Sequence, residues 1–581
     1  MTIEQLKKLI IYSILMCTGI FLSIYMKNEN VWDFANYHYY NAFAFLNDRS
    51  TLDTVPATVN TFFNPIIDIP LYFYIEYFND YPNIIFALQG IWCGLFLLIL
   101  YKICILFFEN NTNGMRQSLL VVLLTVTGQA TLKQIGSSAN EITVSFFILW
   151  GFYILFKMIK FPSEQALTKF LLAGFIMGIG LGLKQTVVIY CVASGLTLII
   201  CYQYLNKPFK SIFFFALGGL ISYLIINGYF MYQYWVLYGN PFFPFFNGIF
   251  NSPYFFDFNY RDAKFIPSAL EFFIFPFTWN INPYAIAEMP YYDIRLTLYY
   301  VLLISIFIKL LLNKKFIHFY TQKKLLTIVY IFTCLSFLIW MGLFSIMRYT
   351  IIIEATGSLL LIYLFSHLKN KILQVLKFII VSVLVLNSYF YSSWGYIKGP
   401  KYIDMMNISL PENTLIKIYG PPSSFIIPIL SKNQNFKTVS YMPKCTRENK
   451  LCINGKGSDF IEYGPFLENR NKIEQEHVGP IIYIYDKFHM DVFQTKSQVI
   501  ENYRQRFNLC NRAIKKRLFK NKYQCLNMPV AKYKNDIEIA EKYIPYEDIV
   551  FNYTCKYLHN SINHNIKICV PKKLKTQILG E

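Results

Sequence analysis

The sequence predicts a polytopic α-helical membrane protein that ends in a soluble α/β or α+β domain. Of its 581 residues, 55% are hydrophobic and only 15% are charged, whereas soluble proteins usually carry about 25% charged residues. The apolar residues gather in residues 1–394, in repeated runs of about 20, the length that crosses a hydrocarbon core. Residues 395–581 have the mixed composition of an ordinary soluble domain. We therefore expect a membrane domain at 1–394 and a soluble domain at 395–581.

The apolar runs predict about eleven membrane spans, judged by length. Lys7 and Lys8 precede the first run and no small-residue cleavage site follows it, so we expect an uncleaved first span rather than a signal peptide. The predicted spans lie at roughly 9–26, 83–108, 117–132, 141–158, 170–187, 188–205, 211–234, 296–312, 325–346, 350–367 and 372–392.

Cations indicate the orientation of these spans. With the N-terminus in the cytoplasm, nearly every short loop on the inner side is basic, as the positive-inside rule requires. The loops 27–82 and 235–295 and the tail from residue 395 then lie outside. We expect a bacterial inner (plasma) membrane protein with a periplasmic C-terminal domain. The cations on the inner side are Arg116, Lys157, Lys160, Lys169, Lys207, Lys210, Lys314, Lys315, Lys323, Lys324, Lys369 and Lys371.

Cysteines provide a second indication of the compartment. Six of the twelve lie in or beside apolar runs, and six lie in the tail. An even set confined to one soluble domain predicts disulfides in an oxidising compartment. A zinc site is the alternative, although no C-x-x-C occurs. The disulfide candidates are Cys445, Cys452, Cys510, Cys525, Cys555 and Cys569, and pairing of neighbours is one of fifteen possible connectivities.

The predicted external loops carry the candidate functional residues. The first loop reads W-D-F-A-N-Y-H-Y-Y-N over residues 32–41. Its tyrosines suit an interfacial aromatic belt, but Asp33 is a carboxylate beside the hydrocarbon boundary, which is costly unless it has a role or a partner. Glu141 begins a span, where a carboxylate also interacts favourably with a helix N-terminus. Lys184 and Arg348 are outward cations, which require anions such as a carboxylate, a lipid headgroup or a substrate phosphate.

Taken together, these motifs resemble the GT-C superfamily of integral membrane glycosyltransferases, in its bacterial branch that uses polyprenyl-phosphate sugars. The matching motifs are W-D-x-x-N-Y-H-Y-Y-N at 32–41, G-L-K-x-T at 182–186, G-N-P-x-F-P-x-x-N at 239–247 and S-P at 252–253. They cover the N-terminal two-thirds of the chain, and the tail takes no part in the resemblance.

The resemblance implies a role for each of these residues. Asp33 would be the catalytic base that deprotonates an acceptor hydroxyl, and His38 would assist it or bind the sugar. Lys184 and Arg348 would hold the lipid phosphate, while Tyr37 and Asn240 would contact the substrate. Glu141 would orient the donor or bind a divalent cation, Mg²⁺ or Mn²⁺. The paired acids of several metal-dependent relatives are missing beside Glu141, which leaves metal dependence open.

The expected activity is transfer of a sugar from a polyprenyl-phosphate donor to a glycan, lipid or protein acceptor of the cell envelope, such as lipopolysaccharide. An O-antigen polymerase or ligase is the alternative enzyme, although such proteins centre on arginines in external loops and have their large loop between late spans rather than a soluble domain at the end. A transporter is the alternative from another class, but no internal repeat is visible and charges gather at span ends. The net charge of +20 comes with no nucleic-acid-binding motif, so no nucleic-acid partner is expected.

Overall fold

The computed structural model describes most of the chain and divides it into two compact units. Unit 1 comprises Met1–Asn30, Ile66–Leu237 and Arg261–Pro400, and unit 2 comprises Val31–Pro65, Tyr238–Tyr260 and Lys401–Glu581. We describe each unit by itself. The described residues are 2–109, 113–162, 166–258, 260, 263–313, 323–367, 370–390, 393–397, 399–403, 410–419, 423–430, 436–441, 460–461, 464–486, 552–558 and 566–579.

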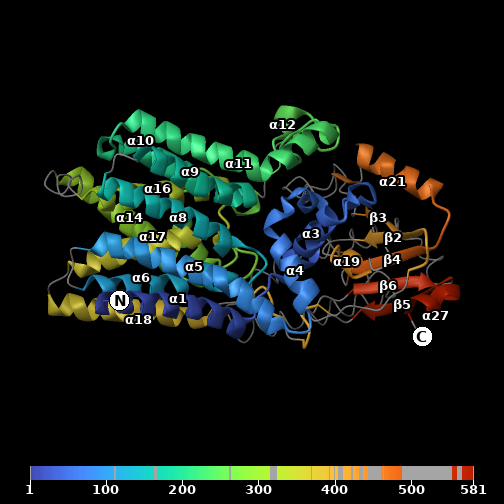
Figure 1. Ribbon diagram of the computed structural model, residues 1–581, viewed down its shortest axis with the longest axis horizontal. Helices are drawn as coiled ribbons and strands as arrows, with labels where there is room; N and C mark the ends of the chain where they lie inside the picture. Colours follow the sequence, from blue (N-terminus) through green and yellow to red (C-terminus); the bar gives the residue numbers. More distant parts are fainter. Residues whose placement is uncertain are drawn as a thin grey trace. The chain divides into compact units, whose positions relative to one another are not determined.

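Unit 1 is a bundle of helices, most of which run roughly parallel or antiparallel to one another (Figure 1). The longer helices are α1 (Ile3–Met26), α5 (Pro82–Phe108), α6 (Gly114–Val126), α8 (Glu141–Lys160), α9 (Ala166–Leu183), α10 (Val188–Ile200), α11 (Pro208–Tyr238), α14 (Arg295–Leu312), α16 (Lys324–Leu343), α17 (Ile351–Ser366) and α18 (Lys371–Asn387). The short elements are α4 (Ile69–Phe78), α7 (Gln129–Gln134), η5 (Gln185–Val187), η6 (Tyr202–Tyr204), η7 (Ala263–Phe265), α13 (Phe275–Ile281), η8 (Met347–Thr350) and η9 (Ser388–Phe390), with η4 (Pro65–Ile67) at the sequence boundary of the units.

The helices of the bundle have the length and apolar composition expected for a multi-pass membrane protein. Among the described residues, eight helical segments are long and apolar enough to cross a membrane, namely α1, α5, α8, α9, α11, α14, α16 and η8 together with α17. These eight coincide with eight predicted spans. The three other predicted spans contain shorter apolar helices, at Gly114–Val126, Gln185–Ile200 and Ile372–Asn387.

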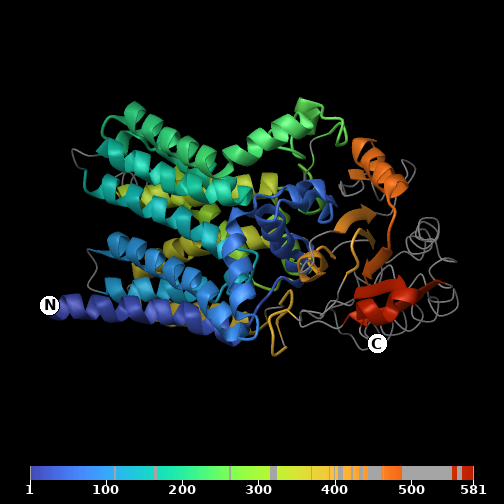
Figure 2. The same cartoon turned by 45° about the vertical axis from the view of Figure 1, so that its right-hand side comes forward.

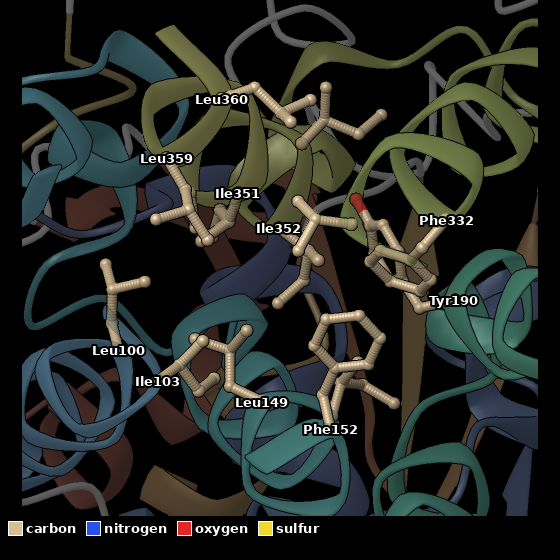
Figure 3. Packing of buried hydrophobic residues seen from close by; sticks show 14 of the residues in the cluster. Leu100, Ile103, Leu149, Phe152, Tyr190, Phe332, Ile351, Ile352, Leu359 and Leu360 are labelled. Carbon is tan, nitrogen blue, oxygen red and sulfur yellow. The ribbon is translucent and has the colours of Figure 1, made fainter. Parts of the chain in front are cut away.

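Helix α17 lies at the centre of the bundle. Its apolar segment is 78% buried, whereas that of α1 is 17% buried, so α1 presents most of its surface outward. Figure 3 shows how Ile351, Ile352, Leu359 and Leu360 of α17 meet side chains of other helices. The neighbours labelled there are Leu100 and Ile103 of α5, Leu149 and Phe152 of α8, Tyr190 of α10 and Phe332 of α16, and all belong to one buried apolar cluster.

Small residues allow close contact between α1 and α5. A Cβ added to Gly19 would lie 2.2 Å from the backbone nitrogen of Gly94, and one added to Gly90 would lie 2.7 Å from the Cα of Ile20. Since lipid tails are as apolar as Leu side chains, helices in a membrane associate through such close backbone packing.

Two buried carboxylates hold the short helix α7 against the bundle. Glu354 of α17 accepts hydrogen bonds from the backbone nitrogens of Ala130 and Thr131, both at 3.0 Å, and from the Thr131 hydroxyl at 2.7 Å. Asp293 accepts one from the backbone nitrogen of Gln129 at 3.1 Å and forms an ion pair with Arg295 at 3.0 Å. The first backbone N–H groups of α7, which no intrahelical acceptor can satisfy, therefore find charged acceptors.

Unit 2 contains a six-stranded sheet with the strand order β1-β3-β2-β4-β6-β5. Strands β1 to β4 pair in parallel, while β4, β6 and β5 pair antiparallel. The strands are β1 (Asp53–Thr54), β2 (Thr414–Tyr419), β3 (Phe436–Tyr441), β4 (Ile481–Asp486), β5 (Tyr553–Leu558) and β6 (Ile566–Pro571). The remaining elements are α2 (Val31–Asp33), η1 (Phe34–His38), α3 (Tyr39–Leu46), η2 (Arg49–Thr51), η3 (Thr58–Phe62), α12 (Asn247–Phe250), α19 (Ile426–Leu430), α21 (Gly464–Glu476), η12 (Lys572–Leu574) and α27 (Lys575–Leu579).

Parts of the two predicted external loops, residues 31–65 and 238–260, group with the tail in unit 2, although the sequence places both loops in the N-terminal domain. In the first loop, Asp53 pairs with Thr438 of β3. Asp53 also forms a buried ion pair with Arg49 at 2.7 Å, and Arg49 donates to the backbone oxygen of Phe436 at 3.1 Å. The second loop joins through aromatic contacts, such as that between Phe255 and Phe460 at 5.0 Å. These contacts between distant segments explain why residues 31–65 and 238–260 group with the tail, while the predicted division at residue 394 stays a prediction.

One of the candidate disulfides lies within the described residues. Cys555 and Cys569 face each other across the antiparallel pair β5 and β6 and are bonded, and both strands appear in red in Figure 2. The other four tail cysteines, Cys445, Cys452, Cys510 and Cys525, lie outside the described residues, so their pairing stays a prediction.

Gly128→Ala should destabilise the protein, because an added Cβ would lie 2.3 Å from the Glu354 carboxylate. We expect a loss of about 1–3 kcal/mol, as for overpacking in a dense core. Thermal unfolding of the detergent-solubilised protein measures it. Gly195→Ala, on a helix where an added Cβ meets nothing within 4 Å, is the matched control and should be neutral or slightly stabilising. Equal melting temperatures for the two variants would show that Glu354 does not constrain this turn.

Candidate functional site

The turn between α7 and α8 is held from two sides. Glu29, after α1, accepts hydrogen bonds from the backbone nitrogen of Ser138 at 3.0 Å and from its hydroxyl at 2.6 Å. Asn140 donates its side-chain amide to Asp68 at 3.0 Å. Gly136 and Asn140 both have positive φ angles, of 79° and 61°, a conformation that Gly and Asn adopt most readily. The residue after this turn, Glu141, is thereby fixed in position.

Glu141 and Lys184 form a buried ion pair at this end of the bundle. The Lys184 ammonium lies 2.6 Å from the Glu141 carboxylate and donates to the backbone oxygen of Ala139 at 2.5 Å. Thr186 donates its hydroxyl to the same carboxylate at 3.4 Å. The Glu141 side chain is 3% exposed and that of Lys184 is 15% exposed, so the cation keeps the greater access to solvent.

Arg348 belongs to the same neighbourhood. It lies in η8, and its guanidinium carbon is 5.4 Å from the ring centre of Tyr349. The Tyr349 side chain interacts electrostatically with both Arg348 and Glu141, and Tyr190 of α10 donates its hydroxyl to the backbone oxygen of Tyr349. The structure therefore places Glu141, Lys184 and Arg348, which are far apart in the sequence, at the same end of unit 1, where Lys184 contacts Glu141 and Arg348 contacts Tyr349.

Asp33, Tyr37 and His38 lie in unit 2, at the start of the first loop. All three side chains are buried, and the rings of Tyr37 and His38 have centres 4.0 Å apart. Their segment is fixed to the end of the sheet. The backbone nitrogen of Phe425, which follows β2, donates to the backbone oxygen of Ala35 at 3.1 Å. Asp33 and His38 thus lie on a segment that the parallel part of the sheet supports.

Asn240 stabilises the turn that carries the predicted G-N-P motif. It donates to the backbone oxygen of Phe245 at 2.9 Å and accepts from the backbone nitrogen of Phe242 at 2.9 Å. Asn247 accepts from the backbone nitrogen of Ser252 at 2.9 Å and donates to its backbone oxygen at 3.0 Å. These bonds explain the two asparagines of the motif structurally, and the predicted contact of Asn240 with substrate stays a prediction.

The donor set around Glu141 does not fit a divalent metal. The Lys184 ammonium already occupies the carboxylate, and no group of three acidic, His or Cys side chains that could hold a metal occurs in the described part of the chain. A metal bound here would have to displace the Lys184 ammonium from the buried carboxylate. We assign no step to a metal, and the predicted divalent cation stays untested.

Three further carboxylates shape this region, although the sequence analysis did not identify them. They are Glu29, Asp68 and Glu354, each of which is buried. Glu354 lies inside an apolar segment, and an ionisable residue within a span is itself a signal of function or of a specific partner. Glu29 and Asp68 carry no comparable signal, because acidic residues are common in loops.

No protein-family model, no curated protein and no solved structure matches this chain.

Lys133 of α7 provides a charge that should make stability depend on pH. The side chain is buried, donates to the backbone oxygen of Pro290 at 3.2 Å and lies 5.2 Å from the ring centre of Trp394. Burial lowers the pKa of Lys133 to about 8, against the opposing effect of the carboxylates of Glu288, Asp293 and Glu354. The folded protein therefore loses this proton at a lower pH than the unfolded chain does.

Between pH 8 and about 10.4, the unfolded chain binds this proton more strongly than the folded protein, so stability should rise with pH across that window. Lys133→Met lacks this effect. We expect the stability of the wild type relative to Lys133→Met to increase by on the order of 1–3 kcal/mol from pH 8 to pH 10. Thermal unfolding of both proteins over that range measures it, and a constant difference would contradict a depressed pKa.

Proposed function

We propose that this protein is a glycosyltransferase that moves a sugar from a polyprenyl-phosphate donor to an acceptor of the cell envelope. The observation that carries the proposal is the cluster of Glu141, Lys184 and Arg348 at one end of a membrane helix bundle. Two cations and one carboxylate, gathered from three distant segments, suit the recognition of an anionic group attached to a lipid.

The reaction needs what these side chains offer. The acceptor hydroxyl loses its proton to a base as its oxygen attacks the anomeric carbon of the sugar. A new C–O bond forms there, the bond between that carbon and the phosphate oxygen breaks, and polyprenyl phosphate leaves. Negative charge grows on the leaving phosphate, and prepositioned cations stabilise it most effectively where water is scarce.

Lys184 and Arg348 are suited to hold that phosphate in different ways. Arg348 has a planar guanidinium that binds two phosphate oxygens at once, and Lys184 acts as a compact point charge. Glu141 keeps the Lys184 ammonium oriented at 2.6 Å before substrate arrives. Because the Lys184 ammonium is more exposed than the Glu141 carboxylate, it can donate a hydrogen bond to a phosphate while it stays paired with Glu141.

The base is assigned by the resemblance to Asp33, with His38 assisting or binding the sugar. Asp33 is 5% exposed, and a shielded carboxylate is a suitable acceptor for a hydroxyl proton. The rings of Tyr37 and His38 are in contact, which supports the proposal that both side chains bind the substrate.

We place this reaction at the outer face of a bacterial inner membrane, with the N-terminus in the cytoplasm. The positions of cations in the predicted short loops support this orientation. The disulfide between Cys555 and Cys569 supports an oxidising compartment for the tail, since such bonds persist outside the cytoplasm. The acceptor is a glycan, lipid or protein exposed on that side.

Asp33→Asn and Lys184→Met should each abolish one glycan component of the host cell envelope, with accumulation of a polyprenyl-phosphate sugar. Removing a general base typically costs about 10²–10⁴-fold in rate, and removing a preorganised charge partner costs about 10²–10³-fold. Mass spectrometry of the envelope glycans and of the extracted lipids, at matched membrane abundance, measures both effects.

Lys169→Met is the matched control, because Lys169 lies in the first turn of α9 and Lys184 directly follows the last turn of the same helix. The Lys169→Met variant should leave the glycans unchanged. An unchanged profile in both site variants, in a host where full deletion alters the glycans, would overturn these assignments. It would favour a polymerase or a transporter.

A further inference from the structure

A short segment of unit 1, residues 268–281, exposes large apolar side chains although it is too short to cross a membrane. It comprises α13 and the turns before it, and Glu271 is the only charged residue between Lys264 and Glu288. An apolar stretch of about 10–14 residues is typical of a buried helix or of a segment at the membrane interface. The first alternative does not fit, because five large apolar side chains are between 45% and 93% exposed, namely Leu270, Phe273, Ile274, Phe277 and Ile281.

Helix α14 holds this segment at the level of its own first two turns. Thr297, in the first turn of α14, donates its hydroxyl to the backbone oxygen of Pro276 at 2.6 Å and accepts from the indole N–H of Trp279 at 2.8 Å. Tyr300, in the second turn, donates its hydroxyl to the backbone oxygen of Phe273 at 3.1 Å. Since α14 is one of the candidate spans and the end of a span lies at the edge of the hydrocarbon core, the segment lies at that edge.

The backbone of the segment is paired to the extent that contact with lipid requires. Lipid offers no water, so backbone N–H and C=O groups that meet it must find partners within the protein. The backbone nitrogens of Ile274 and Phe275 both donate to the backbone oxygen of Glu271, at 3.0 and 2.8 Å, and that of Phe277 donates to Ile274 at 2.9 Å. The two hydroxyls of α14 pair two further oxygens. Much of the backbone polarity is therefore satisfied internally, beneath apolar side chains.

The exposed face of α13 continues the outward apolar surface of α14. The ring of Phe277 has its centre 6.1 Å from that of Tyr300, and the next exposed apolar residues along α14 are Val301 and Ile304. The opposite side of α13 packs on the bundle, where Trp279 is fully buried. A continuous exposed apolar surface is unusual on a protein in water. Because this one extends the surface of a membrane span, lipid is the partner that it fits.

We propose that residues 268–281 form an interfacial anchor, which lies in the membrane leaflet next to the η8 end of the bundle with its exposed apolar side chains among lipid acyl chains. Amphipathic segments of this kind bury their apolar face about 5–10 Å into the boundary between headgroups and acyl chains. The partner is the lipid bilayer itself. The inference does not rest on the proposed function, because it involves no substrate.

The anchor is connected to the turn that carries Arg348. The rings of Trp279 and Trp340 have centres 5.9 Å apart. Trp340 in turn donates its indole N–H to the backbone oxygen of Ile346, two residues before Arg348, at 2.8 Å. An anchor at the boundary of headgroups and acyl chains therefore holds this turn near the depth at which lipid phosphates lie.

The test uses the photoreactive amino acid p-benzoylphenylalanine, which replaces Phe273 or Phe277 in the full chain. The protein is placed in nanodiscs of phosphatidylethanolamine and phosphatidylglycerol and irradiated, and mass spectrometry measures adducts of lipid mass. We expect lipid adducts at both positions, as for the same replacement of Phe307, an exposed residue of the span α14. The matched control replaces Phe275, which lies between the two test positions and is buried. It should give crosslinks within unit 1 and lose the lipid adduct.

Three outcomes would overturn the proposal. A crosslink between two chains at position 273 or 277 would mean that a second copy covers this face. A crosslink to another part of the same chain would mean that the segment is covered within the protein. Absence of any adduct at both positions, while position 307 gives lipid adducts, would mean that the segment faces water. None of these outcomes bears on the proposed transferase, which the glycan measurements test separately.

Discussion

The contact between two buried carboxylates and the start of α7 is the constraint on which the rest of unit 1 depends. Asp293 and Glu354 satisfy the backbone N–H groups of Gln129, Ala130 and Thr131, which a helix of six residues cannot satisfy internally. Burying charge in a membrane bundle is costly unless each charge is paired. Here Arg295 pairs with Asp293, and the neutral donors of Thr131 and the α7 backbone surround Glu354. The arrangement interrupts the run of long helices and fixes a polar turn at one end of the bundle.

That turn determines what lies beside it. The chain after α7 is held by Glu29 on one side and by Asp68 on the other, so the start of α8 cannot shift freely. Glu141 then meets Lys184 of the neighbouring helix end, and η8 brings Arg348 to the same end. The phosphate site that we propose requires cations that are fixed before the substrate arrives, because reorienting them during the reaction would cost free energy.

The sequence predicted the helices well because apolar length is a strong local signal. The run predicted at 83–108 is α5, Pro82–Phe108, with a shift of one residue. The run predicted at 117–132 instead ends as a helix at Val126, and α7 follows as a separate element. Local composition could not show this break, because its cause is Glu354, more than 220 residues further along the chain. The same holds for β1. Asp53 and Thr54 have no strand-like pattern, and they pair with β3 beside the buried ion pair that Arg49 and Asp53 form.

For the candidate site residues, too, local signals could be predicted and long-range contacts could not. The positions of Lys184 and Arg348 at the ends of apolar runs were predictable, because a cation outside the positive-inside pattern is unusual. The pairing of Glu141 with Lys184 could not be predicted, since the two residues lie on different segments and meet only in the folded bundle. Asp33 and His38 belong to a unit assembled from three chain segments. Because the first loop contributes a strand to the sheet of the tail, its segment from Val31 to Leu46 is positioned by the folding of residues that follow more than 350 positions later. The tail therefore holds the first loop in position. Without the tail, the first loop, which carries Asp33, would lose its backbone hydrogen bond to Phe425 and its strand pairing with β3.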